Sequence, residues 1–243
     1  MGGEADKRFS NPARAAPADF GKTYSQLPGL ISASIVLLIG VCVCQFVTLG
    51  PLSRHMSGHI ALMSVAAPIC AAMLWLALPA PRQHQANDKA LWALTIGQMV
   101  LLWVWHVPPV HAATMIFPWL EILLYGLLFC IACLFWFSVL SSTGGRWQSI
   151  FALLATAKLA CLLGALLVFS PRLLYPLPLS VPQHTMHPAA ERPDLADQHF
   201  AGLLMIAACP LSYLLAGVVL AAQLMTALGR ASTLGDRNVP ATR

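Results

Sequence analysis

Long apolar segments separated by short polar ones recur along the chain from residue 28 onward. The first segment, residues 28–50, is long enough to cross a bilayer as an α-helix, which needs about 20 predominantly apolar residues. Five further segments of the same kind follow, at about residues 56–79, 90–107, 118–140, 149–170 and 199–228. The pattern predicts an all-α membrane protein, a bundle of about six transmembrane helices forming one domain over residues 28–228.

Prolines and polar stretches mark the expected boundaries of these helices. Pro68 and Pro210 fall inside apolar segments and predict kinks, because proline cannot donate the helical hydrogen bond. The Pro108-Pro109 pair after the third segment is expected to end that helix. The longer polar stretches are a tail at 1–27, expected to be disordered, an outer loop at 171–198 and a second tail at 229–243.

The composition agrees with a membrane protein. Hydrophobic residues make up 58% of the 243 residues and charged residues only 9%, whereas a soluble domain carries about 25% charged residues. The net charge of +5 is scattered along the chain, so no nucleic-acid-binding surface is expected. All seven cysteines lie in apolar segments, and we interpret them as packing residues, the Cys130-Ile131-Ala132-Cys133 spacing included.

The lysines and arginines predict the orientation. If the N-terminus is cytoplasmic, ten of these residues lie inside and three outside, a strong positive-inside bias. The inside set is Lys7, Arg8, Arg14, Lys22, Arg82, Lys89, Arg146, Arg230, Arg237 and Arg243, and the outside set is Arg54, Arg172 and Arg192. Both termini are therefore expected to be cytoplasmic.

Seven of the eight histidines then gather at the outer face. His55 and His59 open the second span, one helical turn apart on one face, which suits a single metal ion or a haem. The others at this face are His106, His111, His184, His187 and His199, and only His84 lies inside. A single interfacial histidine is more often structural than a ligand. The His55/His59 pair, with His106 and His199 on converging helix ends, predicts a metal or haem site.

Methionines accompany these histidines and bear on the choice of metal. They are Met56, Met63, Met115, Met186 and Met205. Imidazole with thioether suits copper, Cu(I) in particular, while zinc would gain little from methionine. Methionine is also a common packing residue in apolar segments, so the methionines favour copper as the metal without establishing it.

Three ionisable residues complete the candidate set. Lys158 falls in the middle of a span, where a buried charge is a functional candidate, although its side chain can also extend to the interface. Glu121 lies in the first turn of the fourth span and complements the helix N-terminus there. Asp197 precedes the last span and is expected either to cap that helix or to orient a histidine ligand.

Four motifs in this order resemble those of the polytopic CtaG family of cytochrome c oxidase assembly factors. They are His55-Met56-Ser57-Gly58-His59-Ile60 with Ala66-Ala67-Pro68, Trp105-His106-Val107-Pro108, the stretch from Lys158 to Pro176, and Asp197-Gln198-His199-Phe200-Ala201-Gly202-Leu203-Leu204-Met205. The resemblance covers about residues 30–228. Two positions depart from it, because Ile122 follows Glu121 where the family commonly has histidine, and His199 stands where the family usually has glutamine or a similar residue.

The resemblance implies an assembly factor for a haem-copper oxidase in the bacterial inner membrane, with the bilayer and oxidase subunits as partners. Together with the residues it suggests that the protein holds copper at the outer face and hands it over. His55, His59 and His106 would be ligands, with Met56 and His199 as auxiliary ligands and Asp197 and Glu121 as their supporting residues. Because delivery makes no bond in a substrate, no enzyme is expected.

Two other functions stay open at this level. A membrane haem-b electron-transfer protein would use His55 or His59 with His106 as axial ligands. A metal or proton transporter would need ionisable residues near the midplane of several helices, and only Lys158 meets that description.

Overall fold

The computed structural model describes residues 49–78, 87–142, 146–175 and 194–237, and the secondary structure of this part is helical. The predicted span 28–50 lies almost wholly outside these residues, as do His84, His184 and His187. The helices are α2 (Pro51–Ala61), the π-helix η1 (Leu62–Ala66), α3 (Ala67–Ala77), α5 (Asp88–Trp105), α6 (Pro108–Ile116), α7 (Pro118–Ser141), α8 (Arg146–Phe169), α9 (Leu195–Ala207) and α10 (Cys209–Arg237).

Several of these helices are long and apolar enough to cross a membrane. Four runs qualify, namely Pro51–Ala77, Pro118–Ser141, Trp147–Phe169 and Leu195–Thr226. Helices α5 and α6 qualify as a fifth span if the pair, bent by 74°, is counted as one. The described part of the chain is thus a multi-pass helical membrane protein with four or five candidate spans. The predicted sixth span and the orientation of the termini stay predictions.

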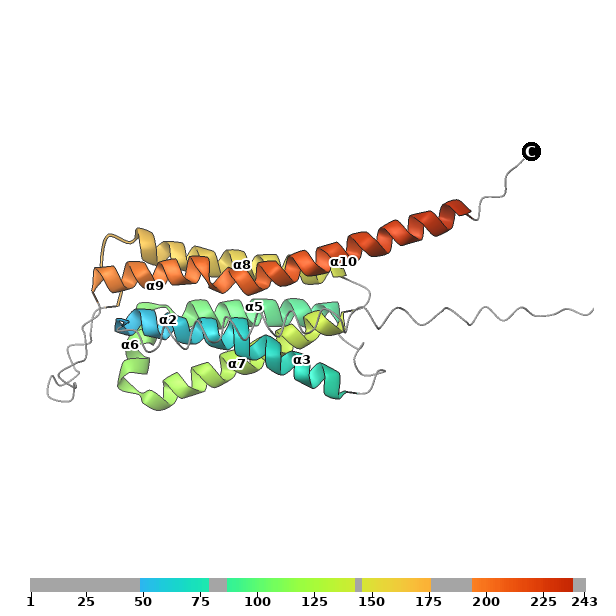
Figure 1. The fold of residues 1–243 in the computed structure, drawn as a ribbon. Coiled ribbons are helices and arrows are strands. Elements are labelled where there is room, and N and C mark those ends of the chain that lie inside the picture. Colours follow the sequence, from blue (N-terminus) through green and yellow to red (C-terminus); the bar gives the residue numbers. More distant parts are fainter. Residues whose placement is uncertain (1–48, 79–86, 143–145, 176–193, 238–243) are drawn as a thin grey trace, which may run out of the picture.

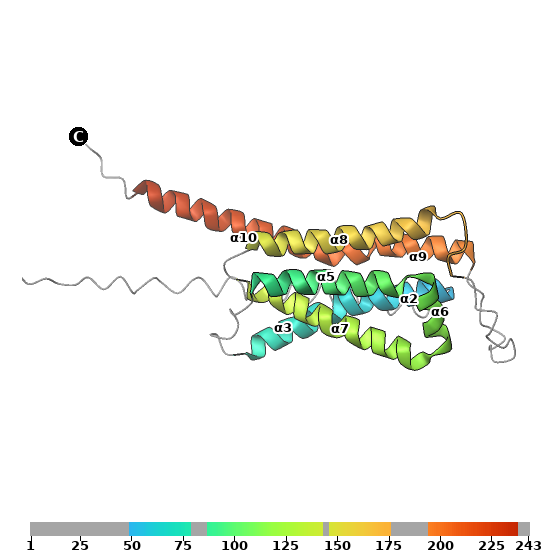
Figure 2. The same ribbon diagram turned by 180° about the vertical axis from the view of Figure 1, so that it is seen from behind.

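The helices run side by side in an elongated bundle (Figures 1 and 2). Helix α8 packs against α9 and α10, α2 packs against α9, and α7 packs against α3 and α5. Helices α2, α7 and α9 begin at the same end of the bundle, where α5 and α8 finish (Figure 1). We call this end the histidine end, because His55, His59, His106 and His111 lie there.

Helix α6 adds an element to those expected from the sequence. The Pro108-Pro109 pair does end α5, but Pro108 also begins a new helix, for which the pattern of apolar segments contained no prediction. Proline is favoured in the first turn because its missing N–H would have no partner there. The short helix lies at the histidine end, turned sharply away from α5 (Figure 2).

The kink expected at Pro68 is a π-helix that begins before the proline. The backbone N–H of Ala67 donates to the Leu62 carbonyl, and Pro68 has no N–H to offer. The Met63 carbonyl therefore loses its helical donors. It accepts instead from the Trp136 indole N–H at 3.0 Å and from the Tyr213 hydroxyl at 3.4 Å. Side chains from α7 and α10 thus satisfy the broken helix inside the bundle.

Two glycines allow α8 and α9 to approach closely. A Cβ added at Gly164 would meet the Gly202 carbonyl oxygen at 2.8 Å, and one added at Gly202 would meet the Gly164 carbonyl oxygen at 2.6 Å. Small residues at such contacts let helix backbones pack tightly in membranes. This contact fixes α9, and with it Asp197 and Gln198, against the end of α8.

Candidate metal site

Three histidines from two segments meet at the histidine end. His55 and His59 stand one turn apart on α2, and His106 caps the C-terminus of α5. Each offers a ring nitrogen, and the three nitrogens lie within 4.8 Å of one another. We call His55, His59 and His106 the histidine cluster. The structure thus brings together the three residues that the sequence analysis placed first among its candidate ligands.

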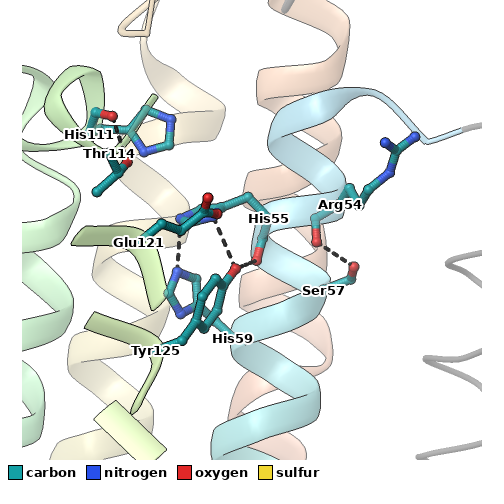
Figure 3. Close-up of polar contacts among 8 residues, drawn as sticks. All are labelled: Arg54, His55, Ser57, His59, His111, Thr114, Glu121 and Tyr125. Carbon is teal, nitrogen blue, oxygen red and sulfur yellow. Dashed lines mark hydrogen bonds and ion pairs between the residues drawn. The ribbon is translucent and has the colours of Figure 1, made fainter. Parts of the chain in front are cut away.

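The closest contact in the cluster joins the two histidines of α2. The Nε2 atoms of His55 and His59 are 2.9 Å apart (Figure 3). Two nitrogens bound to one tetrahedral ion at about 2.05 Å each would stand about 3.3 Å apart. The pair would therefore have to open by only about 0.4 Å to become two ligands of a single ion. In the absence of an ion, a shared hydrogen can join the same two nitrogens.

A backbone contact fixes the tautomer of His106. Its Nδ1 lies 2.6 Å from the Leu102 carbonyl oxygen; since a carbonyl only accepts, Nδ1 carries the hydrogen and Nε2 carries the lone pair. That Nε2 atom is buried and has no hydrogen-bond partner among the residues described. Metal-binding histidines commonly donate their other N–H to a carbonyl in this way. His106 is therefore in the tautomer of a metal ligand, with the lone pair of Nε2 available to an ion.

Tyr125 of α7 supports the cluster from the opposite side, and the sequence analysis did not single it out. Its hydroxyl oxygen lies 3.1 Å from His55 Nδ1 and 3.4 Å from the His55 carbonyl oxygen (Figure 3). If Nδ1 donates to the hydroxyl oxygen and the hydroxyl donates to the carbonyl, His55 keeps its Nε2 lone pair for an ion. Gly58 makes room for this contact, because a Cβ there would stand 3.0 Å from the Tyr125 hydroxyl.

Glu121 brings a carboxylate to the edge of the cluster. Its Oε1 lies 3.9 Å from His55 Nδ1, and its side chain is 44% exposed while that of His55 is 8% exposed. A negative charge here favours a cation in the cluster. Glu121 therefore lies between the buried His55 and the surface, and its supporting role stays a prediction.

His111 lies beside the cluster, although the sequence analysis treated it as an isolated histidine. Its ring centre is 5.1 Å from that of His55 and 4.6 Å from that of Tyr175. The side chain is 3% exposed, and within the described segments neither ring nitrogen has a hydrogen-bond partner. The missed signal was the Pro108-Pro109 start of α6, which folds His111 back over the bundle.

Asp197 and Gln198 tie three segments together at this end. The Asp197 carboxylate accepts hydrogen bonds from the backbone N–H groups of Leu52 at 2.8 Å and Ser53 at 3.1 Å. Asp197 thus caps α2, whereas Asp194 caps α9 itself. Fully buried Gln198 accepts from the Leu174 N–H at 2.7 Å through Oε1, and its amide donates to the carbonyls of Leu167 at 3.3 Å and Arg172 at 3.2 Å.

The other sequence candidates are His199, Met56 and Lys158. A ring nitrogen of His199 is 3.4 Å from the Ser170 carbonyl oxygen, and His199 is not in the group of three that could share an ion. Met56 is fully buried in the hydrophobic core. Lys158 lies on the face of α8 that is turned away from the other helices, beside Trp92 and Trp147, and its role as a charge within a span stays a prediction. The opposite face of α8, with Ala157 and Ala160, is the one packed in the core.

The fold and this site define a class, a multi-pass helical membrane protein with a buried histidine cluster at one end of its bundle. The model of the family described as cytochrome c oxidase caa3 assembly factor (Caa3_CtaG) matches residues 12–227. The chain belongs to this family, and the resemblance seen in its motifs is confirmed. No curated protein and no solved structure matches the chain.

Proposed function

We propose that this oxidase assembly factor binds a copper ion in the histidine cluster and passes it to a subunit of the oxidase at the outer face of the bacterial inner membrane. The observation that carries the proposal is the convergence of three ring nitrogens within 4.8 Å of one another. Two of them, on His55 and His59, are already in direct contact at 2.9 Å. The third belongs to a histidine whose tautomer leaves its nitrogen free.

The chemistry of the cluster suits a metal that prefers imidazole. Neutral imidazole binds copper, zinc, iron and nickel well. A haem-copper oxidase receives its iron within haem and its copper as an ion, so copper is the ion that such an assembly factor would supply. Met56, which is packed in the core, enters the proposal only as an auxiliary ligand. His199 lies beside the Ser170 carbonyl and outside the group of three, and it is not a ligand in this proposal.

The geometry favours an ion over a haem. The haem alternative pairs His55 or His59 with His106 across the iron. Two axial imidazoles bound at about 2 Å each have ring centres about 6 Å apart. The ring centre of His106 lies closer than this to that of His55, at 5.7 Å, and to that of His59, at 5.2 Å. The rings of Trp105 and Tyr125 also pack at 4.5 and 5.2 Å from that of His59.

Copper binding is tested with the purified protein in mild detergent. Cu(I) affinity is measured anaerobically by competition with a chromophoric chelator, for wild type and for the double variant His55→Ala/His59→Ala. His199→Ala is the matched control, a histidine at the same end but outside the cluster. We expect one copper ion per wild-type chain, loss in the double variant and retention in the control. A wild-type protein that binds no copper would overturn the proposal.

Transfer is tested separately. The copper-loaded protein is mixed with the copper-free catalytic subunit of the oxidase, the two are separated, and the metal in each is measured. We expect copper to move to the subunit with wild type. Copper that stays on the assembly factor, under conditions in which the subunit accepts free Cu(I), would contradict handover while leaving binding intact.

A further inference from the structure

We infer that His111 of α6 is a fourth ligand of the same ion, so that the protein holds it with four imidazoles rather than three. The inference rests on the proposed function, since it concerns the ion of the histidine cluster. It adds a residue from a separate helix, and this changes how the ion can be captured and released.

The first argument is the state of the His111 ring. A neutral imidazole has one N–H donor and one acceptor nitrogen, and buried polar atoms in native proteins nearly always have partners. Both nitrogens of His111 are buried without one in the part of the chain that the structure describes. By contrast, both nitrogens of His55 and one nitrogen of His106 have contacts. The absence of a hydrogen-bond partner at both nitrogens is explained if the partner of the His111 ring is the copper ion.

The second argument is that the nearest hydroxyl groups already donate elsewhere. Tyr175, whose ring packs on His111, donates to the His106 carbonyl at 2.8 Å. Thr114, one turn along α6, donates to the backbone carbonyl of His111 at 2.7 Å rather than to its ring (Figure 3). The neighbouring hydroxyl groups therefore leave the nitrogens of His111 available.

The third argument is position. The His111 ring stands at 70° to that of His55, at 5.1 Å between centres, and it lies on the cluster side of α6 (Figure 3). The His111 nitrogens are outside the group within 4.8 Å, so binding requires the ring to turn. Turning about χ2 costs little in histidine, because this torsion is broad and shallow. Val107 and Phe117, both extended, flank α6 and are the points about which a moving α6 would turn.

A ligand on α6 gives the site two coordination states. With α6 in place, four imidazoles would surround the ion. With α6 withdrawn, the three nitrogens of the histidine cluster would remain, with one position open for a ligand from the receiving subunit. Exchange of one ligand at a time lets the ion pass without being released into water.

The test replaces His111 by phenylalanine, which keeps an aromatic ring between His55 and Tyr175 but removes both nitrogens. His111→Ala is the second variant and His199→Ala the control. For each copper-loaded protein, X-ray absorption counts the imidazole ligands and chelator competition gives the affinity. We expect four imidazoles in wild type and in His199→Ala, and three in both His111 variants. We also expect an affinity at least about tenfold weaker in both, since even the partners of ligands are worth about 10–100-fold.

The outcomes separate this inference from the proposed function. If His111→Phe binds copper with the same ligand count and affinity as wild type, the inference is overturned and the three-histidine site stands. If wild type itself binds no copper, both fall. A melting temperature of metal-free His111→Phe at or above that of wild type would show that the ring is not needed as histidine for folding, which strengthens a loss of affinity as evidence for ligation.

Discussion

The carboxylate of Asp197 accepts a hydrogen bond from the backbone N–H of Leu52 at 2.8 Å. These residues are 145 positions apart in the chain, and the bond fixes the start of α2 to the start of α9. The first N–H groups of a helix have no partner within it and carry a partial positive charge, so a carboxylate is well suited there. A Cβ at Gly50, the N-cap of α2, would overlap this carboxyl group. The histidine-bearing helix is thus positioned by a residue from another helix.

Asp197→Asn is expected to lower the stability of the protein. The amide keeps one acceptor but loses the charge and one of the two bonds, and loss of a helix cap costs about 0.5–2 kcal/mol. The measurement is the melting temperature in detergent, with Asp88→Ala, an exposed residue in the first turn of α5, as the control. Copper affinity should fall as well, because His55 follows the capped residues by one turn. An unchanged melting temperature would contradict the capping role.

A second line of support reaches His106 from α9 through the end of α8. Gln198 Oε1 accepts a hydrogen bond from the Leu174 N–H at 2.7 Å. The hydroxyl of the next residue, Tyr175, donates to the His106 carbonyl at 2.8 Å. Tyr175→Phe keeps the ring against His111 and removes only this donor. We expect a loss of about 1–3 kcal/mol in the free energy of unfolding, because a buried carbonyl is left without a partner.

The same tyrosine gives a pH dependence with a defined sign. Burial raises the pKa of Tyr175 from 10.0 to about 12, so the folded protein holds the phenolic proton more tightly than the unfolded chain. The stabilisation is complete below pH 10 and is lost as the pH rises from 10 through about 12. Melting temperatures of wild type and Tyr175→Phe between pH 8 and 11.5 check this. The difference in melting temperature between the two proteins should become smaller only above pH 10. A decrease of this difference at lower pH would contradict the role of the Tyr175 hydroxyl.

Tyr125→Phe tests the support of His55. The change removes the hydroxyl that contacts Nδ1 at 3.1 Å and leaves the ring. Losing a group that orients a ligand typically weakens metal binding about 10–100-fold, so we expect that loss in copper affinity with a nearly unchanged melting temperature. Gly58→Ala should act in the same direction, since its Cβ would press on the hydroxyl. A Tyr125→Phe protein that binds copper as tightly as wild type would rule out this role.

The helices and the His55/His59 pair were predictable from sequence because their signals are local. Apolar length marks a span, and two histidines four apart share a face wherever the helix goes. The contribution of His106 depends on which helix ends converge, and this is not a local property of the sequence. The place of His111 depends on whether Pro108 begins a helix. The same proline pair is compatible with the end of one helix and with the start of the next, so the sequence does not distinguish the two.

The remaining misses concern contacts between helices. A carboxylate before an apolar segment predicts a cap, but nothing local in the sequence says which helix Asp197 caps. Tyr125 is one aromatic residue in an apolar span, and only the packing of α7 against the histidine end distinguishes it. For Lys158 the sequence indicates the position along a span but not the face of the helix, and the residue lies on the face turned away from the other helices.

The break at η1 yields a prediction about the middle of the bundle. Trp136→Phe removes the donor that holds the Met63 carbonyl at 3.0 Å and is expected to cost about 1–3 kcal/mol. Pro68→Ala restores a backbone N–H that can serve the carbonyls freed in η1, so in its presence the indole matters less. The double variant should therefore lose less stability than the two single changes added together, by about 0.5 kcal/mol or more. Unfolding in detergent of the four proteins of this cycle measures the coupling, and strict additivity would mean that the indole and the proline do not act on the same carbonyl.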